Sequence, residues 1–230
     1  MDRFTPTFWD NSAPLLNHLI VLFLPSFLTP LSSMAAKYPT PPPDQFLAIS
    51  CTNVGVGPGG TTSMLARVSI VDYWGKTLLD TYVAPTMQVT DYRTQVTGIE
   101  EKHLSSSKAA PFSTVQNLIS KLIKGKVIVG HSIWNDLSVL GIPHNAVATR
   151  DVALYVPFRN ALRSQQVIGL QTLCWHLMCR RCQDGQQNPI ENARAALDLY
   201  RSNSKEWEAS VSKGNWPCTL PPSTFSRCYL

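Results

Sequence analysis

From residue 46 to about residue 83, hydrophobic and polar positions alternate with the period of a β-strand. This alternation predicts strands over residues 46–54, 64–73 and 77–83. Turn residues separate the three segments, so we expect an antiparallel meander. The glycines that follow the first segment fit the spacing GxGxxG of dinucleotide-binding proteins, but that motif must open a helix and a strand follows here. We therefore assign these glycines to a hairpin turn.

The second part of the chain mixes helical spacing with short apolar runs. Helices are predicted over residues 113–123, 134–140, 170–178 and 191–211, and strands over 126–130 and 146–150. Three antiparallel strands followed by alternating helices and strands predict an α/β fold, a mixed sheet flanked by helices. We expect Trp134 and Trp175 in the core.

Residues 1–45 are expected to lie outside the fold, as an apolar leader and a proline-rich linker. The run "LLNHLIVLFLPSFLTPL" over residues 15–31 is apolar, but polar residues and prolines interrupt it. A leader upstream of a start at Met34, a targeting or anchoring segment, and a packed element are the alternatives. We expect no stable membrane insertion, a folded domain over 46–212 and an irregular tail over 213–230.

Composition indicates a globular protein of one domain. The chain has 230 residues, 44% of them hydrophobic and 15% charged, and a net charge of +5. This small basic excess is compatible with a polyanionic partner and also with an ordinary surface. The spacing of Cys179 and Cys182 resembles half of a zinc site, but no second pair completes it. We expect reduced cysteines in an intracellular protein.

Six stretches, in this order, carry a resemblance to a known family. They are "VGVGPGG", "LARVSIVDYWG", "VTDYRTQVTGI", "VGHSIWNDLSVL", "TRDVALYVPFR" and "ENARAALDLY". Together they resemble the DEDDh 3′–5′ exonucleases of the ribonuclease H-like superfamily, and in particular the RNA exonuclease 4-like branch. The resemblance extends from about Phe46 to Trp207. It implies a ribonuclease H-like fold.

The resemblance also implies a two-metal site made of four carboxylates and a histidine. In such a site two divalent cations align the attacking water and stabilise the leaving oxygen, and the histidine accepts a proton. The five family positions fall on Ser50, Thr52, Asp136, Gln187 and Asn192. Only Asp136 matches the family. One carboxylate cannot hold two divalent cations, and glutamine is not a base near neutral pH.

Neighbouring acidic residues do not replace the missing carboxylates of the family's metal site. Glu191 precedes Asn192, but on a helix the two side chains point about 100° apart. Asp151 and Asp198 lie in stretches where active relatives carry acids beside their catalytic set. Without the resemblance, Asp136 is typical of an exposed carboxylate at the start of a helix.

A nucleic-acid surface is predicted from residues in the family stretches. Arg67, Tyr92, Arg93, Arg150 and Arg159 are of the types that contact phosphates or stack on bases. The alternative is structural, because arginine and tyrosine in such loops also fix local turns and form buried pairs.

We therefore expect an exonuclease-fold protein that has lost catalysis and binds a nucleic acid, RNA rather than DNA, or a protein partner. One alternative is an active 3′–5′ exonuclease in RNA or ribosomal RNA processing. The other is a scaffold that binds a small molecule or a protein in the neutralised pocket. No cofactor is expected, and Mg²⁺ or Mn²⁺ belongs only to the active alternative. The resemblance implies a nuclear or nucleolar location, while the apolar leader leaves membrane or secretory targeting open.

Overall fold

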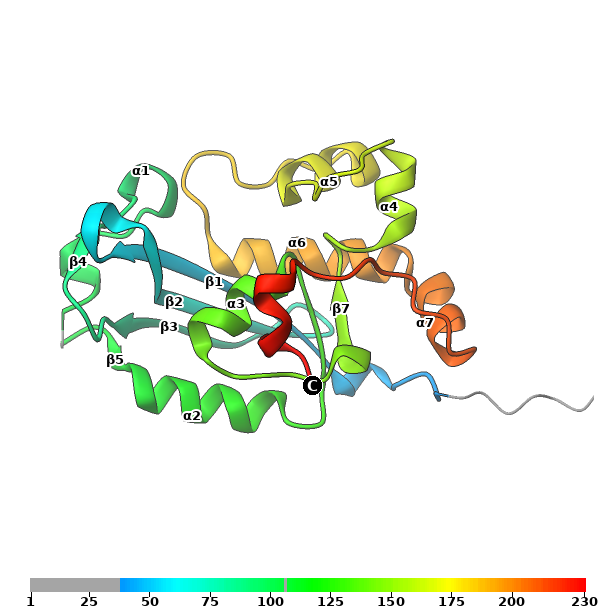
Figure 1. Ribbon diagram of the computed structural model, residues 1–230, viewed down its shortest axis with the longest axis horizontal. Helices are drawn as coiled ribbons and strands as arrows, with labels where there is room; N and C mark the ends of the chain where they lie inside the picture. Colours follow the sequence, from blue (N-terminus) through cyan, green and yellow to red (C-terminus); the bar gives the residue numbers. More distant parts are fainter. Residues whose placement is uncertain (1–37, 106) are drawn as a thin grey trace, which may run out of the picture. The chain divides into compact units, whose positions relative to one another are not determined.

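A seven-stranded mixed sheet organises the chain (Figure 1). It is seen in a computed structural model that describes residues 38–105 and 107–230. The strand order is β5-β3-β2-β1-β6-β7, and β4 pairs with β1. The strands are β1 (Phe46–Val56), β2 (Thr62–Asp72), β3 (Thr77–Ala84), β4 (Val89–Asp91), β5 (Ala110–Pro111), β6 (Val127–Gly130) and β7 (Thr149–Asp151).

The predicted meander is confirmed. β1, β2 and β3 are antiparallel neighbours, whereas β6 and β7 continue the sheet in parallel. The hairpin between β1 and β2 needs its glycines, because a Cβ atom on Gly55 would lie 2.5 Å from the carbonyl oxygen of Gly60. The strand predicted over 146–150 begins only at Thr149, since Ala146–Ala148 forms a 3-10 turn that the Asn145 side chain caps.

Helices cover both faces of the sheet (Figure 1). Along β1, Leu47 and Ile49 pack with residues of α2 and α3, whereas Phe46 and Ala48 pack with residues of α5, α6 and α7. Because adjacent strand residues point to opposite faces, one strand contributes to both halves of the core. The helices are α1 (Thr94–Thr97), α2 (Phe112–Ile123), α3 (Ile133–Leu140), α4 (Val156–Ala161), α5 (Leu170–Met178), α6 (Pro189–Ser202) and α7 (Ser204–Ser212).

The single helix predicted over 191–211 is wrong, because two helices occupy this segment. Asn203 separates α6 from α7 with φ −127° and ψ 16°, outside the helical region. Its neighbours Ser202 and Ser204 both use their hydroxyls to donate to backbone carbonyls nearby. Short polar side chains of this kind compete with helical hydrogen bonds and favour helix ends.

The C-terminal segment expected as an irregular tail packs on the domain. It contains one 3-10 helix, Ser223–Cys228, and isolated bridges pair Tyr229 with His144 and Cys218 with Tyr155. Cys228 is buried in the same core cluster as α2 and α3. The apolar run at 15–31 and Met34 lie outside the described residues. Within those described, no helix combines the length and the apolar composition that crossing a bilayer requires.

A buried ion pair ties β7 to α7. The Arg150 guanidinium makes two hydrogen bonds to the Glu208 carboxylate: Nε donates to Oε1 (2.7 Å) and Nη2 donates to Oε2 (2.9 Å). Nη1 donates to the carbonyl oxygens of Val147 and Thr149, and the Tyr200 hydroxyl donates to Glu208 Oε1. Arg150 is 1% exposed. The prediction that it contacts nucleic acid is wrong, because its guanidinium is buried and occupied.

We predict that Glu208→Ala lowers the free energy of unfolding by about 3–5 kcal/mol, because it leaves the buried Arg150 charge unpaired. Urea denaturation measures the effect. The double variant Arg150→Met, Glu208→Leu should lose less than Glu208→Ala alone, since no charge is left unpaired. As a matched control, Lys102→Ala in the exposed Lys102–Glu100 pair should not move the midpoint. A loss in Glu208→Ala no larger than in Lys102→Ala contradicts the prediction.

Candidate functional site

A polar cleft of about 360 Å³ opens where β1 runs past the end of β6. β6 pairs with β1 only over Phe46–Ala48, and β4 takes up the same edge again at Gly55. Between these points the edge of β1 faces the start of α3, the turn before α5 and the loop before α6. The lining residues are Ile49, Ser50, Cys51, Asn53, His131, Ser132, Asn135, Asp136, Gly169, Leu170, Gln183, Gln187 and Asn192.

The cleft gathers four of the five positions that the resemblance indicates. Ser50, Asp136, Gln187 and Asn192 line it, although they come from four separate parts of the chain. Thr52 does not line it and is buried in the sheet, 6% exposed. A shift in register between β1 and β2 falls directly after Thr52, so the side-chain alternation of β1 is interrupted there.

Asp136 closes the open edge of β1. Its Oδ1 accepts the backbone N–H of Cys51 at 3.0 Å, an amide that would otherwise lack a strand partner. The side chain is 7% exposed, so the expectation of an exposed carboxylate is wrong. Burial raises the pKa of Asp136 well above its usual value, and the charge of Asp151 raises this pKa further.

A second carboxylate fixes the position of α3. Asp151 is the last residue of β7, and its carboxylate accepts the backbone N–H groups of Ser132 (2.9 Å), Ile133 (2.7 Å) and Ala153 (3.0 Å). The first two are the free amides at the N-terminus of α3, where a carboxylate is favoured. Burial nevertheless raises the pKa of Asp151 to about 7. Through this cap, β7 sets the direction in which Asp136 points.

Amide side chains form the opposite wall. Gln183, which has a left-handed backbone (φ 58°), donates from Nε2 to Oδ1 of Asn192 at 3.0 Å. The Gln183 N–H donates to Glu191 (3.1 Å), so this neighbouring acid is used outside the cleft lining. The Gln187 N–H donates to the Val96 carbonyl oxygen (2.7 Å). Gln183 was not predicted, because its sequence context is only a glycine-containing turn.

The residues of the cleft do not fit a pair of divalent cations. Among the described residues, Asp136 is the only carboxylate that lines it, and one of its oxygens already accepts an amide hydrogen. Mg²⁺ and Mn²⁺ require anionic oxygen ligands, whereas Ser50 and Asn192 offer neutral ones. In the part of the chain that is described, no group of three or more His, Cys, Asp or Glu side chains is placed to hold a metal ion.

Two other side chains that line the cleft, His131 and Cys51, are of types that can act as a base or a nucleophile, but neither is in a state suited to that role. His131 Nε2 donates to the Ile168 carbonyl oxygen at 2.7 Å, and burial lowers the pKa of its ring. Burial raises the pKa of the Cys51 thiol well above its usual value, and the Asp136 charge adds to this shift. A thiol that stays protonated is a poor nucleophile. The cleft can therefore donate and accept hydrogen bonds.

The predicted nucleic-acid residues lie outside the lining of the cleft. Arg67 makes two hydrogen bonds to Asp80 (2.9 and 2.7 Å). Arg93 has a left-handed backbone and donates to the Gly60 carbonyl oxygen at 2.9 Å. Arg159 donates to the Thr219 hydroxyl at 3.0 Å and to the Gln165 carbonyl oxygen. Tyr92 packs with the small cluster around Val54. These intramolecular contacts occupy the guanidinium groups of Arg67, Arg93 and Arg159.

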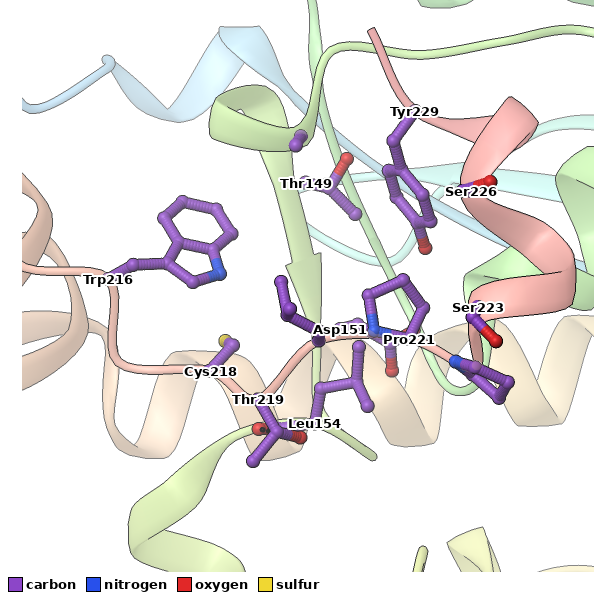
Figure 2. A pocket seen from close by; sticks show the side chains of 13 residues that line it. Thr149, Asp151, Leu154, Trp216, Cys218, Thr219, Pro221, Ser223, Ser226 and Tyr229 are labelled. Atoms are coloured by element: carbon purple, nitrogen blue, oxygen red, sulfur yellow. Dashed lines mark hydrogen bonds between the residues drawn. The ribbon is translucent and has the colours of Figure 1, made fainter.

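A second pocket, of about 370 Å³, lies under the C-terminal segment (Figure 2). Leu154, Trp216 and Pro221 give it an apolar wall, and Tyr229 points into the same region. The buried Tyr229 hydroxyl has no hydrogen-bond partner among the described residues. Asp151 also borders this pocket. This pocket was not predicted, because part of its wall is the C-terminal segment expected to be irregular.

We predict that Asp136→Asn stabilises the chain at about pH 8 by on the order of 1 kcal/mol or more. Asparagine keeps an acceptor for the Cys51 N–H and removes the buried charge. Because its pKa is raised in the folded state, Asp136 favours folding at low pH, and this contribution is lost as the pH rises from about 4 through the raised pKa. Asparagine does not titrate and shows no such loss.

Urea denaturation at about pH 4 and about pH 8 measures this difference. The gain of Asp136→Asn over the natural chain should be present at the higher pH and absent at the lower one. Asp44→Asn, at an exposed carboxylate, is the control and should give no pH-dependent difference. An Asp136→Asn variant that is less stable than the natural chain at the higher pH contradicts the buried-charge account.

The chain is similar to known nucleases along most of its folded part, although no family model matches it. RNA exonuclease 4 of Cryptococcus neoformans is 42% identical over 169 residues, which are 74% of this chain and 41% of that protein. The apoptosis-enhancing nuclease of Homo sapiens is 40% identical over 183 residues, 77% of this chain and 55% of that protein. The chain thus spans about half the length of these curated relatives.

A solved structure shares the architecture. The pseudoubiquitin hydrolase–RNA exonuclease module of Saccharomyces cerevisiae Pan2, in complex with AAGGAA RNA, superposes with a TM-score of 0.63 and 26% identity. The match covers 74% of this chain and 30% of that one. The mixed sheet and its flanking helices are therefore those of a ribonuclease H-like exonuclease domain.

Proposed function

Because this chain belongs to the DEDDh family of 3′–5′ exonucleases, we propose that it binds single-stranded RNA in the cleft without cleaving it. The observation that carries the proposal is the set of side chains at the cleft. One buried carboxylate stands where the family chemistry needs four, and a glutamine stands where it needs a histidine. We assign Ser50, Thr52, Asp136, Gln187 and Asn192 to the family positions.

The loss of catalysis follows from electrostatics. Two divalent cations bring four positive charges, and Asp136 offers at most one negative charge to balance them. Burial raises the pKa of Asp136 and so disfavours even that charge. Gln187 cannot accept the proton of an attacking water, which removes general-base assistance of about 10²–10⁴-fold.

RNA is the ligand that the remaining features favour. Relatives are named RNA exonucleases, and the Pan2 module is bound to RNA. Four carboxylates without metal would repel a phosphate chain, whereas the neutral amides and hydroxyls of this cleft do not. The net charge of +5 has the sign that suits a polyanion. The nuclear or nucleolar location implied by the resemblance remains part of the proposal.

We predict no 3′–5′ shortening of end-labelled single-stranded RNA or DNA with Mg²⁺ or Mn²⁺ under single-turnover conditions. The combined variant Ser50→Asp, Thr52→Glu, Gln187→His, Asn192→Asp restores the missing charges and should gain metal-dependent cleavage. The combined variant with Asp136→Ala added is its control and should be inactive. If the natural chain shortens RNA and Asp136→Ala abolishes this, the chain is an active exonuclease and the proposal is wrong.

We also predict that RNA affinity is unchanged by EDTA, because no metal ion takes part in binding. The dependence on salt should be shallow, since the arginines first considered are engaged within the protein. The slope of log K against log salt should correspond to one to three phosphate contacts, at about −0.7 per contact. Fluorescence anisotropy of a labelled oligonucleotide measures both. Binding that vanishes in EDTA, or no binding at low salt, contradicts the proposal and favours a protein or small-molecule partner.

A further inference from the structure

An aromatic side chain is presented to solvent beside the cleft. Trp175 on α5 is 50% exposed, so its predicted place in the core is wrong. Leu170, Leu173 and Cys174 fill the inner face of α5, and Trp175 lies on the outer face. Its exposure leaves a large, flat aromatic surface open to solvent, and covering that surface would be favourable.

An unpaired cation lies over this ring. The guanidinium carbon of Arg181 is 5.8 Å from the centre of the Trp175 ring. α5 ends at Met178, and the left-handed backbone of the next residue, Cys179 (φ 51°), reverses the chain. Arg180 then pairs with Asp198, while Arg181 turns back over the outer face of α5. Within the described chain, Arg181 makes no ion pair.

The ring and the cation border a hollow next to the cleft. This outer hollow, of about 300 Å³, is lined by Gln171, Thr172, Trp175, His176, Arg181 and Asp184. Two chain segments connect the outer hollow to the cleft. Leu170 and Gln183 line the cleft, and the residues that directly follow them line the outer hollow.

We infer that Trp175 and Arg181 form a stacking platform for one base of the single-stranded RNA that occupies the cleft. This inference rests on the proposed function. A flat aromatic ring stacks on a base of any sequence, and an arginine beside it supplies a cation–π contact and a charge for phosphate. The unpaired charge of Arg181 favours RNA over a protein partner, whose docking would need a larger apolar surface. Asp184 is the opposing charge in the outer hollow.

An abasic scan tests the platform. A short single-stranded RNA carries one abasic residue at each position in turn, and its affinity is measured for the natural chain and for Trp175→Ala. One position should lose affinity about 5- to 100-fold in the natural chain, and that penalty should disappear in Trp175→Ala. Trp175→Phe should retain part of the penalty. Arg181→Gln should weaken binding and reduce the salt slope by the amount of one contact.

Trp74→Ala is the matched control, because Trp74 is 66% exposed, lies in the β2–β3 turn and lines neither the cleft nor the outer hollow. It should bind the natural RNA and every abasic RNA as the natural chain does. An abasic penalty that persists in Trp175→Ala, or an equal loss in Trp74→Ala, overturns the platform while leaving RNA binding intact. If the natural chain binds none of the RNAs, both this inference and the proposed function are wrong.

Discussion

The structure depends on an interrupted strand pairing. β1 is the central strand of the sheet, yet β6 covers only its first three residues on one side. An open edge inside a folded domain leaves backbone amides without partners, and each such amide must be satisfied. Asp136 satisfies the Cys51 amide, and Asp151 holds the helix that brings Asp136 there. The cleft is the space that this arrangement leaves between β1, α3 and α6.

Periodicity in the sequence was sufficient for the elements that are long and packed on one side. The meander, α2 and α5 follow from it, and α5 matches its predicted bounds, residues 170–178. β4 and β5 have three and two residues, which is too short for an alternating pattern. The break at Asn203 was missed because the hydrophobic pattern continues across it into α7, where Trp207 is fully buried.

Tertiary contacts explain the site residues that sequence reasoning placed wrongly. Arg150 and Glu208 are 58 positions apart, and Asp136 meets an amide 85 positions away. Neither the buried pair nor the buried carboxylate has a local signature, since helix-start carboxylates and loop arginines are ordinarily exposed. Trp175 is the opposite case. An apolar residue at helical spacing predicts burial, and the pattern does not distinguish a ring on the outer face of the helix.

The one acid that lines the cleft among the described residues is also one that the fold uses. In the cleft only Asp136 accepts a hydrogen bond from the β1 backbone, so exchanging it for a group without an acceptor would leave the Cys51 amide unpaired. The Asn192 side chain accepts from Gln183 instead, and carboxylates at positions 50 and 192 would add negative charge to the cleft that Asp136 lines. Without bound metal such repulsion destabilises the folded state. Under the proposed function, carboxylates at positions 50 and 192 would therefore carry a cost without a benefit, whereas Asp136 would still be needed by the β1 backbone.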